Sequence, residues 1–382
     1  MESIGVGLIG FGLAGSVFHA PLIASVPSLR LVAVATSRAG EVRARCPEAV
    51  VEERADRVIE RDDVDVVVVA NPHPLHFETA RRALEAGKHV VVEKPFTMRA
   101  REAEELIRLA EARGRLLTVF HNRRWDGDFL TVKRLVTAGE LGEVYTYEAH
   151  YDRYRPQAAD RWQERAGSGG TLFNLGPHLV DQALQLFGRP QWVWADVGVQ
   201  RGDGAEGNGA AGGAPAGASA GGSAGAPAGA LAGAEDYFHI VLGYGRLRAV
   251  LHSAYVVPDP GPRFLVHGHR GSFCKYGIDP QEDQLKAGVR PGAAEWGRDR
   301  PEMYGRLSVV REDGTVERRV IETKRGCYER FYEGLADALL RGGSPPVDAR
   351  EARDVIQVLE WAQESSRTGC RMDCVWPDGQ DG

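Results

Sequence analysis

A glycine-rich turn near the start of the chain constrains the fold more than any other feature. The sequence reads IGVGLIGFGLAG over residues 4–15, so an apolar run is followed by Gly10, Gly12 and Gly15 in G-x-G-x-x-G spacing. A helix-compatible stretch at 14–25 and a second apolar run at 29–35 complete a strand–turn–helix–strand unit. Such glycines permit a tight turn and the close approach of a pyrophosphate, which the free amides of the helix N-terminus bind. We therefore predict a dinucleotide site, with a glycine-rich turn that binds nothing as the alternative. The predicted binding residues are Gly10, Phe11, Gly12, Leu13, Ala14 and Gly15.

The end of the second strand bears on which dinucleotide binds. It reads Thr36, Ser37, Arg38, without the acidic residue that would hold the ribose hydroxyls of NAD and repel a 2′-phosphate. The Ser37 hydroxyl can donate to a phosphate, and the Arg38 guanidinium can neutralise it and bond to it. We expect NADP as the cofactor, with NAD possible if Arg38 is merely solvated or stacks on adenine.

Strands and helices alternate as far as residue 120. Apolar strands are predicted at 64–72, 89–92 and 115–120, with helices at 75–88 and 100–114 between them. This alternation predicts a doubly wound parallel sheet, a Rossmann domain over residues 1–122. Ligands of such sheets collect at the carboxyl ends of the strands. The further cofactor candidates there are Asn71, Pro72, His76, Glu93, Lys94, Asn122 and Arg123, although His76 could instead cap its helix.

The alternation stops after residue 122, and strands dominate. Strands are predicted at 143–151, 192–200, 237–244, 247–257 and 263–276, so a second domain with a large sheet is expected over 123–382. Residues 202–234 consist mostly of alanine and glycine, whose side chains are too small to offset the entropy of ordering. We interpret this insertion as a disordered loop between two strands, with a functional lid as the alternative.

The composition excludes several classes of protein. A net charge of −6 over 382 residues gives no electrostatic reason to bind nucleic acid. No apolar run is long enough to span a membrane, and the N-terminus lacks the features of a signal peptide. The five cysteines are scattered, which suggests reduced thiols in a cytoplasmic protein. Cys370 and Cys374 are too isolated to form a zinc site, so no metal site is expected.

Several segments together resemble a known family. They are the early glycine motif, ANPHPLH at 70–76, AGKHVVVEKPF at 86–96, GGTLFNLGPHLVDQALQLFG at 169–188 and FYEGLADALLRGGSPPVDAREARDVIQVLEWA at 331–362. The chain is similar over nearly its whole length to the glucose–fructose oxidoreductase, inositol dehydrogenase and MocA family, and within it to the NADP-linked scyllo-inositol dehydrogenase branch. The resemblance implies a Rossmann domain followed by an α/β domain with a large, mostly antiparallel open sheet. One face of that sheet commonly packs on another subunit, which implies a homodimer or homotetramer.

The resemblance also implies an activity and a catalytic pair. The family transfers hydride between a nicotinamide and a secondary alcohol or ketone of a small molecule, here a cyclic polyol or sugar. Lys94 and His178 would flank the substrate, with His178 as the base and the Lys94 cation favouring the alkoxide. We expect GGTLF to be a strand or loop and His178 to lie in the first turn of the next helix.

One position departs from the family pattern. Asn174 stands four residues before His178, where the family usually has an aspartate that can orient the imidazole. Asp181, one turn after His178, could compensate or could be structural. Without that charge, Asn174 could simply position substrate and leave His178 a weaker base.

The residues that would contact substrate are less distinctive. Tyr151, Arg155 and Trp162 could wall a polyol pocket together with Asn174 and His178, or they could be ordinary packing residues. Arg124 is expected to form a structural ion pair. Two alternative functions remain: a reductase of another carbonyl or of an imine, and a catalytically weak sensor that binds the dinucleotide.

Overall fold

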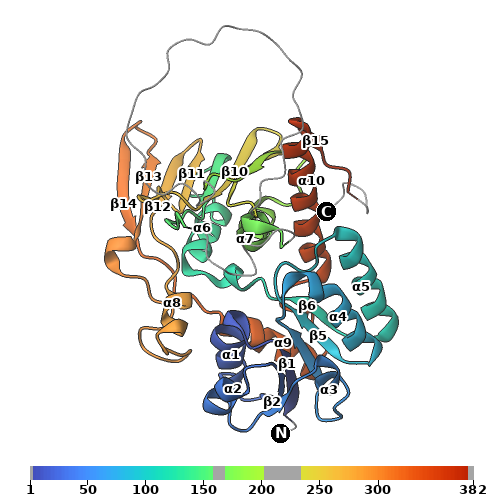
Figure 1. Cartoon of the computed structure of the whole chain (residues 1–382). Helices are drawn as coiled ribbons and strands as arrows, with labels where there is room; N and C mark the ends of the chain where they lie inside the picture. Colours follow the sequence, from blue (N-terminus) through green and yellow to red (C-terminus); the bar gives the residue numbers. More distant parts are fainter. Residues whose placement is uncertain (1–2, 158–167, 202–233, 377–382) are drawn as a thin grey trace, which may run out of the picture.

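The computed structural model describes residues 3–157, 168–201 and 234–376. It contains two sheets, one in the lower half of Figure 1 and one in the upper half. Trp162 and almost all of the Ala/Gly-rich insertion lie outside the described residues, so their predicted roles stay predictions. Within the described ranges, no helix is both long enough and apolar enough to cross a membrane.

The first sheet has six parallel strands in the order β3-β2-β1-β4-β5-β6. The strands are β1 (Ile4–Ile9), β2 (Leu29–Ala35), β3 (Val50–Glu52), β4 (Val66–Val69), β5 (His89–Val92) and β6 (Leu117–Val119). The helices of this half are η1 (Ala14–His19), α1 (Ala20–Ala24), α2 (Ala39–Arg45), α3 (Ala55–Ile59), η2 (His73–Leu75), α4 (His76–Glu85) and α5 (Ala100–Arg113). Every residue of β1 and β4 is buried, because helices cover both faces of the sheet. The predicted doubly wound sheet is confirmed.

The second sheet has nine strands in the order β14-β13-β12-β11-β7-β10-β9-β8-β15. They are β7 (Val144–His150), β8 (Trp192–Gly198), β9 (Tyr237–Tyr244), β10 (Leu247–Ala254), β11 (Phe264–Gly268), β12 (Gly271–Lys275), β13 (Gly305–Val310), β14 (Val316–Ile321) and β15 (Met372–Asp373). The pairing of β7 with β10 is parallel and the other pairings are antiparallel. The large, mostly antiparallel sheet is therefore confirmed.

Helices cover one face of the second sheet. α7 (Gly170–Phe187) packs on β9 and β10, and α10 (Ala349–Thr368) packs on β8 and α7. The remaining helices are η3 (Asn122–Trp125), α6 (Gly127–Thr137), α8 (Gln281–Lys286), η5 (Pro301–Met303) and α9 (Glu329–Arg341).

The predicted start of α7 is wrong. GGTLF forms the beginning of this helix and is not a strand or loop, so His178 lies about two turns inside it. Gly169 and Gly170, with φ of 84° and 52°, allow the sharp entry into the helix. A short apolar run after two glycines does not by itself distinguish a strand from a helix.

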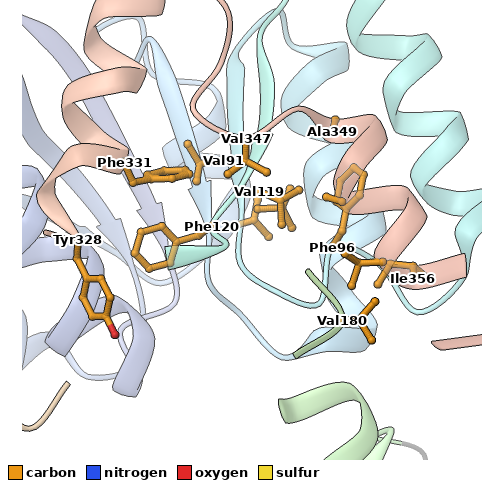
Figure 2. Close-up of a cluster of buried hydrophobic side chains, with 14 of the residues drawn as sticks. Val91, Phe96, Val119, Phe120, Val180, Tyr328, Phe331, Val347, Ala349 and Ile356 are labelled. Atoms are coloured by element: carbon orange, nitrogen blue, oxygen red, sulfur yellow. The ribbon is translucent and has the colours of Figure 1, made fainter. Parts of the chain in front are cut away.

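The last helices of the chain complete the core of the first sheet. Figure 2 shows Val91 and Phe120, from β5 and the end of β6, beside Phe331 of α9. The rings of Phe120 and Phe331 meet edge to face, with centroids 4.8 Å apart. The Thr118 hydroxyl donates to the carbonyl of Val347, which precedes α10, at 2.7 Å. The C-terminal segment is therefore part of the core of both halves.

Candidate active site

The glycine turn after β1 leaves an opening at one position. Gly10 has φ of 101°, and a Cβ on it would strike the Ala70 carbonyl. A Cβ on Gly15 would strike the carbonyl of Gly10, whereas a Cβ on Gly12 would meet nothing within 4 Å. The Ser16 hydroxyl donates to the Gly12 carbonyl at 2.8 Å and helps to hold the turn. A rigid turn with free space over its central glycine fits the pyrophosphate of a dinucleotide, next to the first amides of η1.

The loop after β2 is open to solvent. Ser37 and Arg38 are both exposed, and the Arg38 side chain retains 55 % of its surface. The Arg38 guanidinium lies 3.7 Å from the Glu41 carboxylate, which is a weak surface ion pair. Both predicted phosphate-binding side chains are thus free to reach a ligand at the end of β2.

His76 holds two strand ends together. Its ring is fully buried, with Nδ1 2.7 Å from the Pro95 carbonyl oxygen and Nε2 2.9 Å from the Asn71 carbonyl oxygen. Burial lowers the pKa of this imidazole. Since both ring nitrogens face backbone carbonyls, the structure places His76 as a brace between the ends of β4 and β5. The Asn71 side-chain amide donates to the Thr79 hydroxyl at 2.9 Å, and the adjacent Pro72 is exposed.

Lys94, just beyond β5, reaches across to α7. Its Nζ donates to the Asn174 carbonyl oxygen at 2.8 Å and lies 3.4 Å from the Asn174 side-chain oxygen. Burial lowers the pKa of Lys94 to about 8, although the neighbouring Glu93 carboxylate opposes this shift. This amine can therefore change its charge close to physiological pH.

Glu93 is tied to groups of the protein itself. Its Oε2 accepts from the Lys94 amide at 2.8 Å, and its Oε1 lies 3.2 Å from Nε2 of His19. His19 Nδ1 in turn lies 2.6 Å from the Tyr332 hydroxyl of α9. Burial alone would raise the pKa of Glu93, but His19 and the Lys94 cation bring it below its ordinary value. Glu93 is thus an anion next to Lys94. Through His19 it is linked to η1 and to Tyr332 of α9.

His178 lies one turn after Asn174 on the same helix. Its side chain is buried, and its Nδ1 has no hydrogen-bond partner among the described residues. Burial, together with the positive charge of Lys94 and Arg123, holds the pKa of His178 well below its ordinary value. The imidazole is therefore neutral at pH 7, and it lies within the electrostatic influence of Lys94. The structure thus brings the Lys94 amine to the helix that carries His178, one turn before that residue.

Asp181 does not compensate for the missing aspartate. Its two carboxylate oxygens accept from the Arg124 guanidinium at 2.9 and 2.6 Å. Arg124 also bonds to Glu351 of α10 at 2.6 Å, so the expected structural ion pair is observed. The carboxylate of Asp181 is therefore committed to joining η3, α7 and α10.

Arg123 and Tyr151 form a second buried group. The Arg123 guanidinium donates to Glu282 of α8 at 2.6 Å and lies 4.9 Å from the centroid of the Tyr151 ring. Arg263 lies 4.6 Å from the same ring, and the buried Tyr151 hydroxyl has no partner among the described residues. Asn122, the neighbour of Arg123, is also buried. A buried hydroxyl without a partner, on a ring packed against two guanidinium groups, is a candidate to bind a polar ligand.

Arg155 is connected to Asn174 through Tyr255. The Arg155 guanidinium lies 5.7 Å from the centroid of the Tyr255 ring, and the Tyr255 hydroxyl accepts from the Asn174 amide at 3.5 Å. The structure thus places two of the predicted substrate residues, Arg155 and Asn174, around one tyrosine that the sequence did not single out. His19, Glu282, Arg263 and Tyr332 were also missed, because each meets its partner only across a long stretch of chain.

The sequence matches an oxidoreductase family over both halves of the chain. Residues 4–121 match the model of an oxidoreductase family with an NAD-binding Rossmann fold, and residues 133–373 match that family's C-terminal alpha/beta domain. The chain is 41 % identical to scyllo-inositol 2-dehydrogenase (NADP(+)) IolW of Bacillus subtilis over 369 residues, 96 % of this chain and 95 % of that protein.

Two solved structures share the fold over nearly the full length. The structure of yvaA from Bacillus subtilis is 39 % identical with a TM-score of 0.85, over 97 % of this chain and 100 % of that chain. An oxidoreductase from Bacillus cereus is 30 % identical with a TM-score of 0.84, over 98 % of this chain and 99 % of the other.

Proposed function

The chain belongs to the glucose–fructose oxidoreductase, inositol dehydrogenase and MocA family of oxidoreductases, and on that premise we propose that it transfers hydride between NADP and an inositol-like cyclic polyol. The observation that carries this proposal is the bond between the Lys94 amine and the Asn174 carbonyl, one helical turn before His178. It brings a cation and a neutral imidazole to the carboxyl edge of the first sheet, where ligands of such sheets bind.

The cofactor preference rests on the loop after β2. The exposed Ser37 and Arg38 offer a hydroxyl and a guanidinium to a 2′-phosphate, and the loop has no carboxylate at residues 36–38 to repel it. The name of the Bacillus subtilis relative points to the same cofactor. A dinucleotide held by the glycine turn and the loop after β2 would supply the hydride acceptor for the alcohol and the hydride donor for the ketone.

The side chains of this site would accept the hydroxyl proton of the substrate and stabilise the negative charge that develops on its oxygen. Neutral His178 accepts the hydroxyl proton as the alcohol is oxidised. The Lys94 ammonium donates to the same oxygen and stabilises the negative charge that develops on it. Glu93, anionic and buried behind Lys94, favours the charged form of that amine.

The surrounding groups suit a substrate rich in hydroxyls. Arg155 and Tyr255 offer a guanidinium and a flat ring face near Asn174, and the Tyr151 hydroxyl offers a donor on the ring that packs against Arg123. A site that bonds to substrate hydroxyls discriminates strongly against analogues that lack them, because its buried polar groups would then stay unpaired. This supports a polyol or sugar over an apolar ketone.

The test is a set of initial-rate assays with matched cofactors. Reduction of a panel of inososes and keto-sugars is followed by loss of NADPH or of NADH absorbance, and inositol oxidation is followed in reverse. We expect turnover of at least one inosose, with kcat/KM for NADPH at least about tenfold above that for NADH. Arg38→Ala should remove this preference and leave the NADH-dependent rate unchanged. Equal use of both cofactors by the unaltered chain would rule out the NADP preference.

A dinucleotide-binding sensor is the second candidate. It is favoured by Asn174 in the place of the family aspartate and by the strongly lowered pKa of His178, both of which weaken the base. Tight NADPH binding without turnover over the whole panel would support the sensor. Turnover of other ketones or cyclic imines, but of no inosose, would support a reductase of a different substrate.

A further inference from the structure

The outer face of the second sheet, turned away from α7 and α10, carries a row of polar side chains. Asp196 of β8, His239 of β9, His252 of β10 and His150 of β7 are successive partners in the strand register. Their neighbours along the strands, such as Leu251, point to the other face and are fully buried beneath the helices. Three imidazoles and a carboxylate therefore lie side by side across four strands, on a face that the candidate active site does not use.

Three side chains in this area converge on one point. His150, Asp152 and His252 each offer one ligand atom, and these atoms lie within 4.8 Å of one another. Asp152 Oδ1 is 2.8 Å from His252 Nδ1, and Asp152 Oδ2 is 3.6 Å from His150 Nδ1. Atoms bound about 2.0–2.1 Å from a tetrahedral zinc ion lie roughly 3.3 Å from each other. The 3.6 Å spacing is close to this value, whereas the 2.8 Å spacing is a hydrogen bond that must lengthen when both atoms bind one ion.

Neighbouring groups hold these ligands in the required orientation. The Glu148 carboxylate lies 3.3 Å from His150 Nε2, which leaves Nδ1 of that ring to face Asp152. Asp152 Oδ1 also accepts from the Ala254 amide at 3.0 Å. A carboxylate on the distal nitrogen of a histidine is a common support for a metal-binding imidazole. In the single chain the side chains of His150 and His252 are 22 % and 20 % exposed.

We propose that His150, Asp152 and His252 form a binding site for a divalent metal ion of the zinc class. Two imidazole nitrogens and one carboxylate oxygen supply three ligands, and water takes the fourth position. Imidazole favours zinc and similar ions over magnesium and calcium, which prefer oxygen. Sequence spacing predicts no metal site here, because Asp152 and His252 are 100 residues apart and meet only through the pairing of two strands.

Such an ion would hold residues 150–152 against β10, and the middle residue of this segment faces the candidate active site. Tyr151 lies between two of the ligands in sequence, and its ring points inward to Arg123. The Tyr151 amide donates to the His252 carbonyl at 2.9 Å, and the Ser253 hydroxyl donates to the Tyr151 carbonyl at 2.8 Å. The ion would add a further connection between the same two stretches of chain. Its role is therefore structural, and it takes no part in electron transfer.

The test is calorimetric titration of the full chain with zinc chloride after removal of metals by a chelator and dialysis. We expect one equivalent to bind and the thermal unfolding midpoint to rise with zinc. His252→Gln and Asp152→Asn should each weaken binding by at least about tenfold, because each removes one of three ligands. Asp152→Asn keeps an oxygen that can accept from the Ala254 amide, so this variant separates the loss of a ligand from a loss of folding.

His267→Gln is the matched control. His267 is an exposed histidine on the neighbouring strand β11, and its Nδ1 lies 2.8 Å from the Ser272 hydroxyl. Its replacement should leave zinc binding unchanged, and every variant should retain the NADPH affinity of the unaltered chain. The proposal is overturned if the unaltered chain binds no zinc, or if a double variant at 152 and 252 binds it as well as the unaltered chain does.

Discussion

Lys94 is half-buried, and the loss of water around its amine lowers the pKa of that amine to about 8. Replacing it by methionine keeps the length of the side chain and removes the charge. We expect kcat to fall by about 100- to 1,000-fold, because the donor to the developing alkoxide is lost. Initial rates at saturating NADP and polyol measure this. Lys324→Met, at an exposed lysine, is the control and should keep full activity. A loss below tenfold in the Lys94 variant would show that the amine does not act on the reacting oxygen.

The pH dependence of turnover should report the same amine. Because the pKa of Lys94 is about 8, the ammonium form dominates below that pH and is lost above it. We expect kcat for alcohol oxidation to decrease as the pH rises through about 8. Lys94→Arg keeps its charge at all these pH values, so whatever activity it retains should show no such decrease. If kcat of the arginine variant falls with the same midpoint, the titrating group is not Lys94.

A substitution at Asn174 should shift the pKa of Lys94. In Asn174→Asp a carboxylate would replace the amide oxygen that lies 3.4 Å from the Lys94 amine. An anion at this distance favours the charged amine, so the pKa of Lys94 should rise by at least about one unit. The decrease in kcat should then move to higher pH, as measured by the same rate profile. Asn174→Ser, which adds no charge, should leave the midpoint in place, and an unaltered profile in the aspartate variant would contradict the expectation.

The turn between β1 and η1 allows binding and folding to be separated. Gly12→Val adds a side chain where nothing lies within 4 Å, so the chain should fold with an unchanged thermal midpoint while NADPH binding is lost. Gly10→Ala instead forces a Cβ onto the Ala70 carbonyl at a φ of 101°, so it should lower the thermal midpoint. NADPH fluorescence titration and thermal unfolding measure the two effects. Normal NADPH affinity in Gly12→Val would show that no pyrophosphate lies over this glycine.

Elements with a strong local pattern were predictable, and those defined by distant contacts were not. The residue ranges of β1, β2 and β9 follow directly from their apolar or alternating runs. The segment with α2, β3 and α3 was not assigned, because it is charged and β3 is only partly buried at the edge of the sheet.

The candidate site shows the same division. Lys94 could be predicted because it follows a buried strand, and His178 because its motif resembles the family. The contact of His19 with Tyr332 joins residues 313 positions apart, and that of Arg123 with Glu282 joins residues 159 apart. No local pattern records either pair. The sequence left open whether Asp181 supports His178 or is structural. The structure answers this, because the Asp181 carboxylate bonds to Arg124.

α9 packs into the core of the first sheet, although it follows β7 to β14 of the second sheet in the sequence. Phe331 is fully buried against Phe120 at the end of β6 (Figure 2). Phe331→Ala should lower the free energy of unfolding by about 3–5 kcal/mol, the usual cost of an aromatic side chain removed from a core. Leu340→Ala, at a 54 % exposed position of the same helix, should change it by no more than about 0.5 kcal/mol. Urea unfolding measures both variants, and equal effects would show that α9 does not anchor the first sheet.

The place of α9 in the first sheet has a consequence for how the protein is made. The ribosome releases β1 to β6 before α9, so the apolar surface around Phe120 stays uncovered while β7 to β14 are made and until Phe331 emerges. A nascent chain with such a surface is exposed to aggregation during that interval. The strands of the first sheet should therefore associate with cellular chaperones while they are tethered, and release should coincide with the emergence of α9 and α10.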